Sequence, residues 1–308
     1  MPKPLPSGIV ASSVTPFGRD GTPNLPAIKP HIDWLIAEGV HGISPLGSSG
    51  EFFAMESADR KRVLEAAIEA IAGRVPVMAG THHYSTQIAV DLSRHAERAG
   101  ADSLLIVPPY YGGPTPVAVM DHYRRIAGSV SIPVVLYHNS ASTGVDLSTE
   151  QVARLFAEGA IGAVKFSNIL PDRLVELMQA TDWKLPIYAG FDYVAFEALC
   201  HGAIGWISGL PSVTPRATRA MFETITRDGD LARARGQWKD LAPLMRFIFE
   251  SHTGRSGAHW CAVMKAALSM IGPDVGDPLP PTPTLDRAGR ERLVPLLTAL
   301  GYTVKPQS

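Results

Sequence analysis

The sequence is poor in the features that mark several common protein classes. Its 308 residues include only two cysteines, Cys200 and Cys261, with no CxxC motif or ligand-spaced Cys/His cluster beside them. A disulfide framework is therefore excluded, and a reducing, cytoplasmic location is expected. No apolar run is long enough to cross a membrane, and the first residues lack the apolar core of a signal peptide. We therefore expect a soluble, unprocessed protein with no membrane partner.

The sequence also lacks an excess of either charge and is poor in lysine. The net charge is −1, so bulk charge predicts no polyanion-binding surface and no nucleic-acid partner. Only eight of the 28 basic residues are lysines. A lysine inside an apolar run is therefore an informative residue in this chain.

Short apolar runs bounded by turn residues alternate with segments of helical spacing. The predicted strands are 9–15, 42–46, 76–80, 102–107, 133–138, 161–165, 186–190 and 204–208. The predicted helices between them are 25–38, 56–72, 86–99, 117–128, 148–157, 171–180, 193–200 and 214–227. Strands that are apolar on both faces and alternate with helices indicate a parallel sheet. Eight such units predict an α/β protein with a (β/α)₈ barrel, with a doubly wound open sheet as the alternative.

The strand pattern stops after residue 228. Helices are predicted at 231–249, 257–271 and 288–299, with the proline-rich segment 273–283 before the last of them. We therefore predict a catalytic barrel at 1–228 and a helical C-terminal extension at 229–308.

Active sites of such barrels lie at the C-terminal ends of the strands, which draws attention to Lys165. This lysine ends a predicted strand, between Val164 and Phe166. Burial disfavours its ammonium form and frees a lone pair for attack on a carbonyl carbon, which is Schiff-base chemistry. The alternative is a structural ion pair at the barrel mouth. Lys265, in a mostly apolar predicted helix, is interpreted instead as a lysine that snorkels to solvent.

Two further features suit an imine-forming lysine. Tyr137 ends the neighbouring predicted strand and can shuttle protons, although a core tyrosine with a satisfied hydroxyl is the alternative. In GSSGE, two glycines flank Ser48 and Ser49 shortly before a predicted helix. Backbone N–H groups and hydroxyls in such a segment can bind a carboxylate, and an ordinary turn with a helix cap is the alternative.

The ordered set GSSGE, VPPYYGGP, YHNSASTG, Lys165 and AGFD resembles the dihydrodipicolinate synthase / N-acetylneuraminate lyase family of pyruvate-type class I lyases over essentially the whole chain. The resemblance implies a TIM barrel with a small helical C-terminal domain and an imine between Lys165 and a 2-oxo acid, without cofactor or metal. It implies proton transfer by Tyr137, a hydrogen bond from Ser48 to Tyr137, and binding of the 2-oxo acid carboxylate by Ser49.

The resemblance also implies a homo-oligomer, either a dimer or a homotetramer. In many members of the family a relay tyrosine enters the site from a neighbouring subunit, and Tyr111 matches that residue. Tyr110, beside it in VPPYYGGP, is expected at the same interface.

Departures from the family pattern narrow the expected substrate. Ser142 stands where the synthases carry an arginine that binds the carboxylate of aspartate semialdehyde, and a neutral hydroxyl cannot make that charge-assisted contact. Phe166 replaces a glutamate of the synthases, while Ser167 and Asp192 resemble hydroxyl-binding residues of the lyases. The expected substrate-binding set is completed by residues at other predicted strand ends, namely Gly190, Ser208 and Gly209.

These residues predict a Schiff-base-forming lyase that is not a true dihydrodipicolinate synthase. We expect aldol cleavage or condensation, or dehydration, of a hydroxylated 2-oxo acid such as a 2-oxo-3-deoxy sugar acid. Deamination of a cyclic imine by the same lysine chemistry is the alternative.

Three other classes of function stay open at this point. A metal-dependent barrel aldolase or hydrolase is possible because His82, His83 and His138 all stand at predicted strand ends. A phosphate site in the loop after GAIGWISG is the second alternative, since phosphate sites of barrels often lie near the last two strands. The third is a non-catalytic protein that binds a 2-oxo acid.

Overall fold

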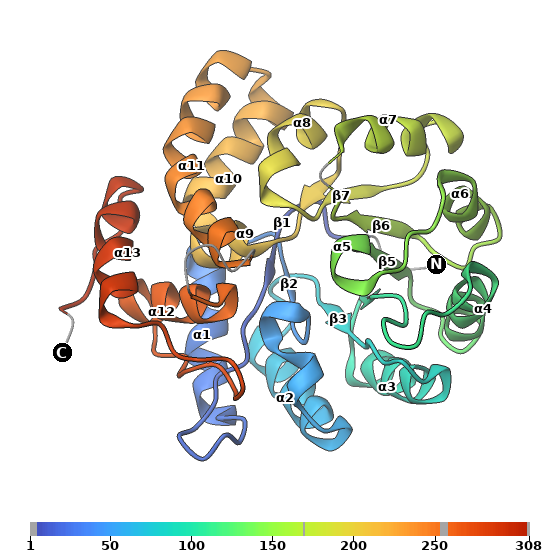
Figure 1. The fold of residues 1–308 in the computed structure, drawn as a ribbon, viewed down its shortest axis with the longest axis horizontal. Coiled ribbons are helices and arrows are strands. Elements are labelled where there is room, and N and C mark those ends of the chain that lie inside the picture. The colour runs from blue at the N-terminus through green and yellow to red at the C-terminus, as the bar shows by residue number, and fades with distance from the viewer. Residues whose placement is uncertain (1–4, 169, 253–257, 307–308) are drawn as a thin grey trace.

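Eight parallel strands form a barrel with helices between them in the computed structural model (Figure 1). The structure describes residues 5–168, 170–252 and 258–306. The strands are β1 (Gly8–Ser12), β2 (Gly42–Ser44), β3 (Met78–Gly80), β4 (Ser103–Ile106), β5 (Val134–His138), β6 (Ala163–Phe166), β7 (Ile187–Ala189) and β8 (Gly205–Trp206). They are ordered β2-β1-β8-β7-β6-β5-β4-β3, and a parallel bridge between Ile43 and Val77 joins the two ends of the sheet. The predicted barrel is confirmed.

The strands are linked by long helices and by short helical turns. The long ones are α1 (Leu25–Ala37), α2 (Ser57–Ile71), α3 (Thr86–Ala99), α4 (Pro116–Ala127), α6 (Thr149–Ala157), α7 (Pro171–Ala180), α8 (Ala195–Cys200) and α10 (Pro215–Glu223). The short ones are η1 (Ser48–Gly50), η2 (Phe52–Ala54), α5 (Ser140–Thr143), η3 (Asp192–Val194), α9 (Gly209–Val213) and η4 (Thr224–Asp228). The long helices match the prediction closely, and η3 and η4 overlap the predicted helices 193–200 and 214–227. The other short helices, η1, η2, α5 and α9, were not predicted because three to five residues carry no helical periodicity.

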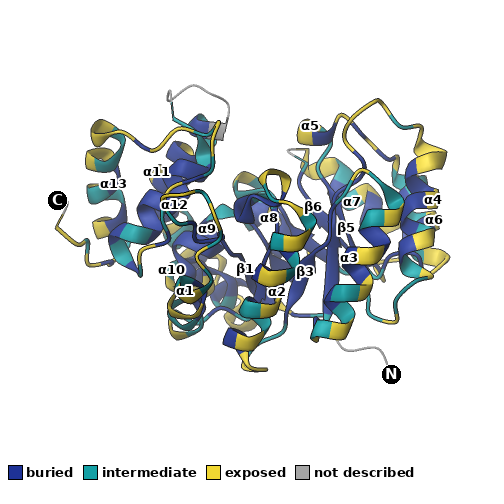
Figure 2. Ribbon diagram, turned by 90° about the horizontal axis from the view of Figure 1, so that it is seen from below, coloured by how far each residue is buried: buried dark blue, intermediate teal, exposed yellow. Residues whose placement is uncertain are grey.

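Alternation along the strands decides which side chains point into the barrel. Figure 2 shows the strands buried at the centre of the molecule, with exposed residues on the outer faces of the helices. Successive side chains of a strand point to opposite faces. Ala163 therefore shares its inner face with Lys165, and Val135 shares its inner face with Tyr137. The β5–β6 register places Tyr137 directly opposite Lys165.

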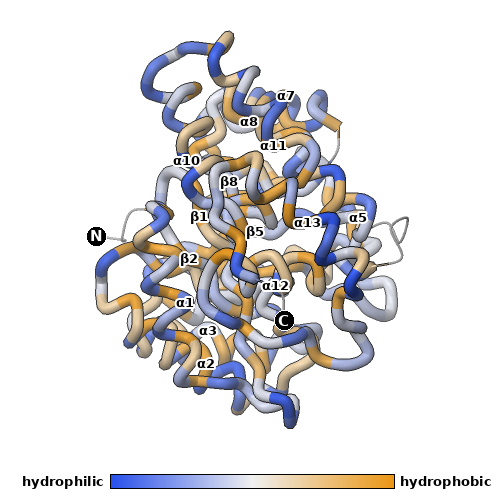
Figure 3. The backbone as a smooth tube through the Cα atoms, turned by 90° about the vertical axis from the view of Figure 1, so that its left-hand side faces the viewer, coloured by the Kyte–Doolittle hydropathy of each residue, from blue (hydrophilic) through white to orange (hydrophobic). Residues whose placement is uncertain are grey.

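Three helices follow the barrel: α11 (Leu231–His252), α12 (Trp260–Ile271) and α13 (Arg287–Ala299). They pack on one another and against the barrel helices α9 and α10, and they face the viewer in Figure 3. The helical C-terminal part is thus confirmed, while the domain boundary at residue 228 stays a prediction. The predicted start of the second helix, residue 257, lies outside the described residues. None of the helices in the described ranges combines the length and the apolar composition that a membrane span requires.

Candidate active site

A cavity of about 540 Å³ opens at the C-terminal ends of the barrel strands. It is lined from the loops that follow the strands and from α11 and α12. Ten of the predicted site residues line it: Ser48, Ser49, Tyr137, Ser142, Lys165, Ser167, Gly190, Asp192, Ser208 and Gly209. The remaining one, Tyr111, does not.

Lys165 and Tyr137 lie side by side in this cavity. The lysine is 4% exposed, and its Nζ lies 3.8 Å from the centroid of the Tyr137 ring. Asn139 Nδ2 donates to the Tyr137 hydroxyl at 3.2 Å, and Ser48 and Lys165 also hydrogen-bond this hydroxyl. The pairing follows from the strand register, because residues opposite each other on neighbouring strands share a face.

The surroundings of Tyr137 favour its phenolate. Burial alone raises the pKa of the hydroxyl, but the charge of Lys165 and the hydrogen bonds from Ser48, Lys165 and Asn139 outweigh burial. The pKa of Tyr137 is therefore lowered from its ordinary value. A tyrosine in this state can both accept and return a proton beside the lysine.

The GSSGE segment forms a tight turn directly after β2. Ser48 and Ser49 lie in η1, a three-residue 3₁₀ turn, and the next long helix begins only at Ser57. The sequence pattern placed the two serines shortly before a long helix. In the structure they lie in η1 instead, seven residues or more before that helix begins. A Cβ at Gly47 would lie 2.9 Å from Ser12 Oγ, so a glycine lets this turn approach the end of β1.

Gly190 has an equally specific place beside the lysine. A Cβ at this position would overlap the Ser167 hydroxyl and would lie 2.9 Å from Lys165 Cγ. The Ser167 hydroxyl donates to the Gly190 carbonyl oxygen at 2.8 Å. Gly190 thus leaves room for both the lysine and a fixed serine oxygen in the cavity.

Asp192 and Ser208 form a second polar group in the cavity. Asp192 Oδ1 accepts hydrogen bonds from Trp206 Nε1, at 3.0 Å, and from the Ser208 hydroxyl. Burial raises the pKa of Asp192 to about 6, although these hydrogen bonds, one from the Leu210 backbone and the charge of Lys165 oppose the rise. The carboxyl group therefore changes charge close to neutral pH.

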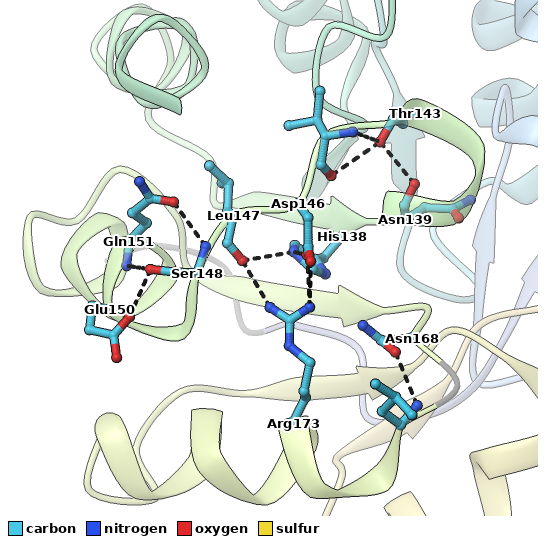
Figure 4. A network of polar contacts seen from close by, with 12 residues as sticks. His138, Asn139, Thr143, Asp146, Leu147, Ser148, Glu150, Gln151, Asn168 and Arg173 are labelled. Carbon is cyan, nitrogen blue, oxygen red and sulfur yellow. Dashed lines mark hydrogen bonds and ion pairs between the residues drawn. The ribbon is translucent and has the colours of Figure 1, made fainter. Parts of the chain in front are cut away.

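Ser142 lines the cavity from α5, in the loop after β5. Behind this loop, Arg173 binds Asp146 at 2.8 Å and donates to the Leu147 carbonyl oxygen at 3.1 Å (Figure 4). Arg173 is thus held by a carboxylate and a backbone oxygen, and it does not line the cavity. Among the described lining residues, Lys165 is the single cation.

Sequence reasoning missed a group of aromatic side chains that we call the aromatic wall. Tyr193 lies at its centre, with its ring centroid 4.9 Å from Phe249 and 6.0 Å from Phe191. Its members on α11 and α12 were missed because only strand ends were searched for site residues. An aromatic residue on an amphipathic helix is ordinarily interpreted as part of the hydrophobic core. The aromatic wall consists of Phe53, Phe191, Tyr193, Phe249 and Trp260.

The two tyrosines of VPPYYGGP have different environments. Tyr110 lines the cavity, with its ring 6.5 Å from that of Phe52. Tyr111 is 79% exposed in the single chain. Its predicted role in a neighbouring subunit's site stays a prediction.

The three histidines at strand ends have separate partners. His82 Nδ1 accepts from the Val107 N–H at 2.8 Å, and His83 Nδ1 accepts from the Ser85 N–H at 2.9 Å. His138 Nε2 lies 3.2 Å from the Leu147 carbonyl oxygen. A search of the described ranges finds no group of three or more His, Cys, Asp or Glu side chains that could hold a metal ion.

The interpretation of Lys265 as a snorkelling lysine is wrong. Its Nζ lies 2.7 Å from Glu51 Oε1, and both side chains are 1% exposed. The lysine cannot reach solvent because α12 is enclosed by α11, α13 and α9. Lys29, Lys184 and Lys265 lie in ion pairs, whereas Lys165 has none with the described residues.

Comparison with known proteins gives one consistent result. The model of the dihydrodipicolinate synthetase family matches residues 5–300. The chain is 37% identical to the 4-hydroxy-tetrahydrodipicolinate synthase of Pelobacter propionicus over 228 residues, which are 74% of this chain and 78% of the relative. It is 34% identical to the enzyme of the same name from Methanoculleus marisnigri over 297 residues, 96% and 99% of the two chains.

A solved structure agrees over nearly the full length. YagE, a prophage protein of E. coli K12 that belongs to the dihydrodipicolinic acid synthase family, was solved in complex with pyruvate. It superposes with a TM-score of 0.89 at 30% identity, covering 97% of this chain and all of its own.

Proposed function

The chain belongs to the dihydrodipicolinate synthetase family, and from this premise we propose that it is a lyase that binds a 2-oxo acid as an imine on Lys165. One observation carries the assignment of the lysine. Lys165 is buried beside Tyr137, whose pKa is lowered, and no ion pair occupies its ammonium among the described residues. A buried amine next to a proton-transferring hydroxyl is what imine formation requires.

The reaction begins with attack of the Lys165 amine on the C2 carbonyl carbon of the 2-oxo acid. Tyr137 protonates the resulting carbinolamine hydroxyl, which leaves as water, and Ser48 passes the proton to and from the tyrosine. Ser49 holds the carboxylate with its hydroxyl and backbone N–H. The positively charged imine then accepts the electron pair released when a bond at C3 breaks.

Loss of the proton from a C4 hydroxyl breaks the C3–C4 bond and releases an aldehyde, leaving the enamine of pyruvate. Protonation at C3 and hydrolysis then free pyruvate and restore Lys165. The same imine also allows dehydration: removal of a C3 proton gives the enamine, which then expels the C4 hydroxyl as water. All of these steps balance without a cofactor.

Other polar residues of the cavity support a hydroxylated substrate without a second carboxylate. Asp192, Ser208 and Ser167 offer hydrogen bonds to substrate hydroxyls. The aromatic wall lines the same cavity, and Ser142 supplies no positive charge. A distal carboxylate would therefore be desolvated without a charged partner, which is costly.

Deamination of a cyclic imine remains the second candidate, because it uses the same Lys165 and Tyr137. Product analysis separates the two. A panel of 2-oxo acids and cyclic imines, assayed for pyruvate, for loss of water and for ammonia, should give pyruvate or a dehydrated 2-oxo acid if the first proposal is right.

We also propose that the working unit is a homo-oligomer in which Tyr111 reaches a neighbouring site. Its 79% exposure in the single chain leaves the side chain available for such a contact. Mixing inactive Lys165→Ala and Tyr111→Phe chains should restore activity through hybrid sites. A fully active monomer at assay concentration in sedimentation would contradict this proposal.

Borohydride trapping tests the central assignment. The protein is reduced with and without pyruvate, with and without a chelator, and the peptides are analysed by mass spectrometry. We expect a pyruvate-dependent adduct on Lys165 in both chelator arms and none in Lys165→Arg, because a guanidinium is not a nucleophile at neutral pH. Labelling of another lysine, or no labelling by any 2-oxo acid that is turned over, would exclude the imine mechanism.

A further inference from the structure

The last residue of GSSGE has no role in the proposed chemistry, yet it forms the buried ion pair with Lys265. The 2.7 Å contact between Glu51 Oε1 and Lys265 Nζ connects the loop after β2 to α12. Buried ion pairs contribute little net stability, because the loss of hydration offsets their attraction. Stability alone is therefore a poor reason for this pair, and its neighbours indicate another.

Glu51 fixes the end of the turn that carries the two serines. Its backbone has φ 55 and ψ 38, a left-handed conformation that is unfavourable for a residue with a Cβ. Its N–H donates to the Ser48 carbonyl oxygen at 3.1 Å, and its Oε2 accepts from the Leu279 N–H at 2.8 Å. The carboxylate thus holds Glu51 in a conformation that closes η1 around Ser48 and Ser49.

Lys265, the partner of Glu51, is itself fixed by further contacts. Its Nζ donates to the Asp277 carbonyl oxygen at 3.0 Å and lies 4.2 Å from the centroid of the Phe17 ring. The preceding residue, Met264, lines the cavity, and its Sδ lies 3.9 Å from Ser49 Oγ. One turn of α12 therefore contacts both Glu51 and Ser49.

Glu51 is the carboxylate paired with Lys265, and the charges of Cys261 and Asp277 act on this lysine more weakly. The nearest titratable group that faces Lys265 from α1 is His31, and burial, followed by the charge of Lys265, lowers the pKa of His31 to about 4. This histidine is therefore neutral at physiological pH, and neither of its ring nitrogens has a hydrogen-bond partner among the described residues. Asp277 contacts the lysine through its backbone oxygen.

We propose that Glu51 and Lys265 are positioning residues that hold Ser48 against the Tyr137 hydroxyl and Ser49 against the substrate carboxylate, so that α12 of the C-terminal part sets the geometry of the barrel site. This rests on the proposed imine chemistry at Lys165. Neither residue touches the reacting atoms. Both act through the η1 turn.

Three variants test the proposal: Glu51→Gln, Lys265→Met and the double variant that combines them. Each single variant leaves one buried charge unpaired and is expected to lower the melting temperature. The double variant removes both charges and should recover much of that loss. Leu293→Ala is the matched control, because it opens a cavity in α13, which contributes no residue to the site.

The double variant separates positioning from simple stability. We expect its kcat to stay at least tenfold below wild type, and its KM for the 2-oxo acid to rise, even where its melting temperature has recovered. The limb of the pH–rate profile that reports Tyr137 should move to higher pH, because the hydrogen bond from Ser48 helps to lower the pKa of Tyr137. Leu293→Ala should keep the wild-type kcat, KM and pH profile.

A double variant with wild-type kcat, KM and pH profile would overturn the proposal, as would single variants that are folded and behave like Leu293→Ala. Trapping of pyruvate by the wild-type protein is measured in the same series. Failure of that trapping would contradict the proposed imine chemistry. Normal trapping, together with variants whose kinetics are unaffected, would contradict only the positioning role of Glu51 and Lys265.

Discussion

Two lysines are buried among the residues that the structure describes, and they occupy contrasting environments. Lys265 lies between α12 and the loop after β2, where the Glu51 carboxylate neutralises its charge. Lys165 lies on the inner face of β6, where a tyrosine ring and hydroxyl groups surround it instead. The exposed fractions are almost equal, at 1% and 4%.

On the proposed assignment of Lys165, burial alone does not identify a reactive lysine. Burial lowers the pKa of Lys265, but the Glu51 carboxylate in contact favours the ammonium form and occupies it as a structural partner. A tyrosine whose own pKa is lowered can remove and return a proton, which leaves the amine available for a carbonyl carbon. The partner of the lysine decides which of the two roles it has.

Substitution of each lysine is the strongest way to test this contrast. Lys165→Ala should lower kcat by more than ~10⁴-fold, since Lys165 supplies the single amine among the described lining residues and imine formation requires an amine. Lys265→Met should leave measurable turnover, because it acts only through the η1 turn. The measurement is the steady-state rate of each variant, divided by the concentration of folded protein, in preparations whose circular dichroism spectra match that of the wild type. A Lys265 variant that is as inactive as Lys165→Ala while fully folded would break the contrast.

The second prediction concerns the partner that distinguishes Lys165. Tyr137→Phe should keep the fold and much of the substrate affinity but lower kcat by roughly 10²–10⁴-fold, the usual effect of losing a positioned acid–base group. If the phenolate is the working base, activity rises with pH through the pKa of Tyr137. Pre-steady-state trapping with pyruvate and a full pH–rate profile provide the measurement.

Ser48→Ala supplies the control for that profile. It removes one hydrogen bond that lowers the pKa of Tyr137, so the rising limb should move to higher pH while Tyr137 remains. A Tyr137→Phe enzyme with near-wild-type kcat, or a Ser48→Ala profile unchanged from wild type, would remove the tyrosine relay from the mechanism.

Much of this arrangement could be predicted from the sequence, and the failures share a cause. Lys165 and Tyr137 were recognisable because each stands at the end of a short apolar run, and such a run is a local property of the sequence. The Glu51–Lys265 pair joins residues far apart in the chain, and nothing near Lys265 in the sequence reports a carboxylate. Phe249 and Trp260 of the aromatic wall were missed for the same reason. Their function depends on how the C-terminal helices pack over the barrel.

The third prediction concerns the absence of a second cation among the described lining residues, and the effect of introducing one. Because Ser142 and the aromatic wall offer no charge to a distal carboxylate, aspartate semialdehyde with pyruvate should react with a kcat/KM below ~10⁴ M⁻¹s⁻¹, at least ~10²-fold below the best hydroxylated substrate. Ser142→Arg should raise activity only on substrates with a distal carboxylate. A coupled reductase assay measures product formation. An ordinary enzymatic rate for wild type with aspartate semialdehyde would show that another group binds that carboxylate.

The smallest expected effect concerns Asp192, a carboxyl group that is less buried than Glu51 and has no basic side chain bound to it. Its pKa is about 6 in the folded protein, against 3.8 for an ordinary aspartate, so between these pH values the folded chain holds a proton that the unfolded chain has released. Unfolding therefore releases a proton, and the free energy of unfolding contributed by this group is fully present below pH 3.8 and is lost as the pH rises through about 6. Asp192→Asn should remove this dependence, so that the variant gains stability relative to wild type as the pH rises across that interval. Urea unfolding at several pH values measures the difference, and Asp182→Asn, in an exposed loop, is the control. A constant difference between wild type and Asp192→Asn over that range would show that the carboxyl group titrates normally in the folded protein.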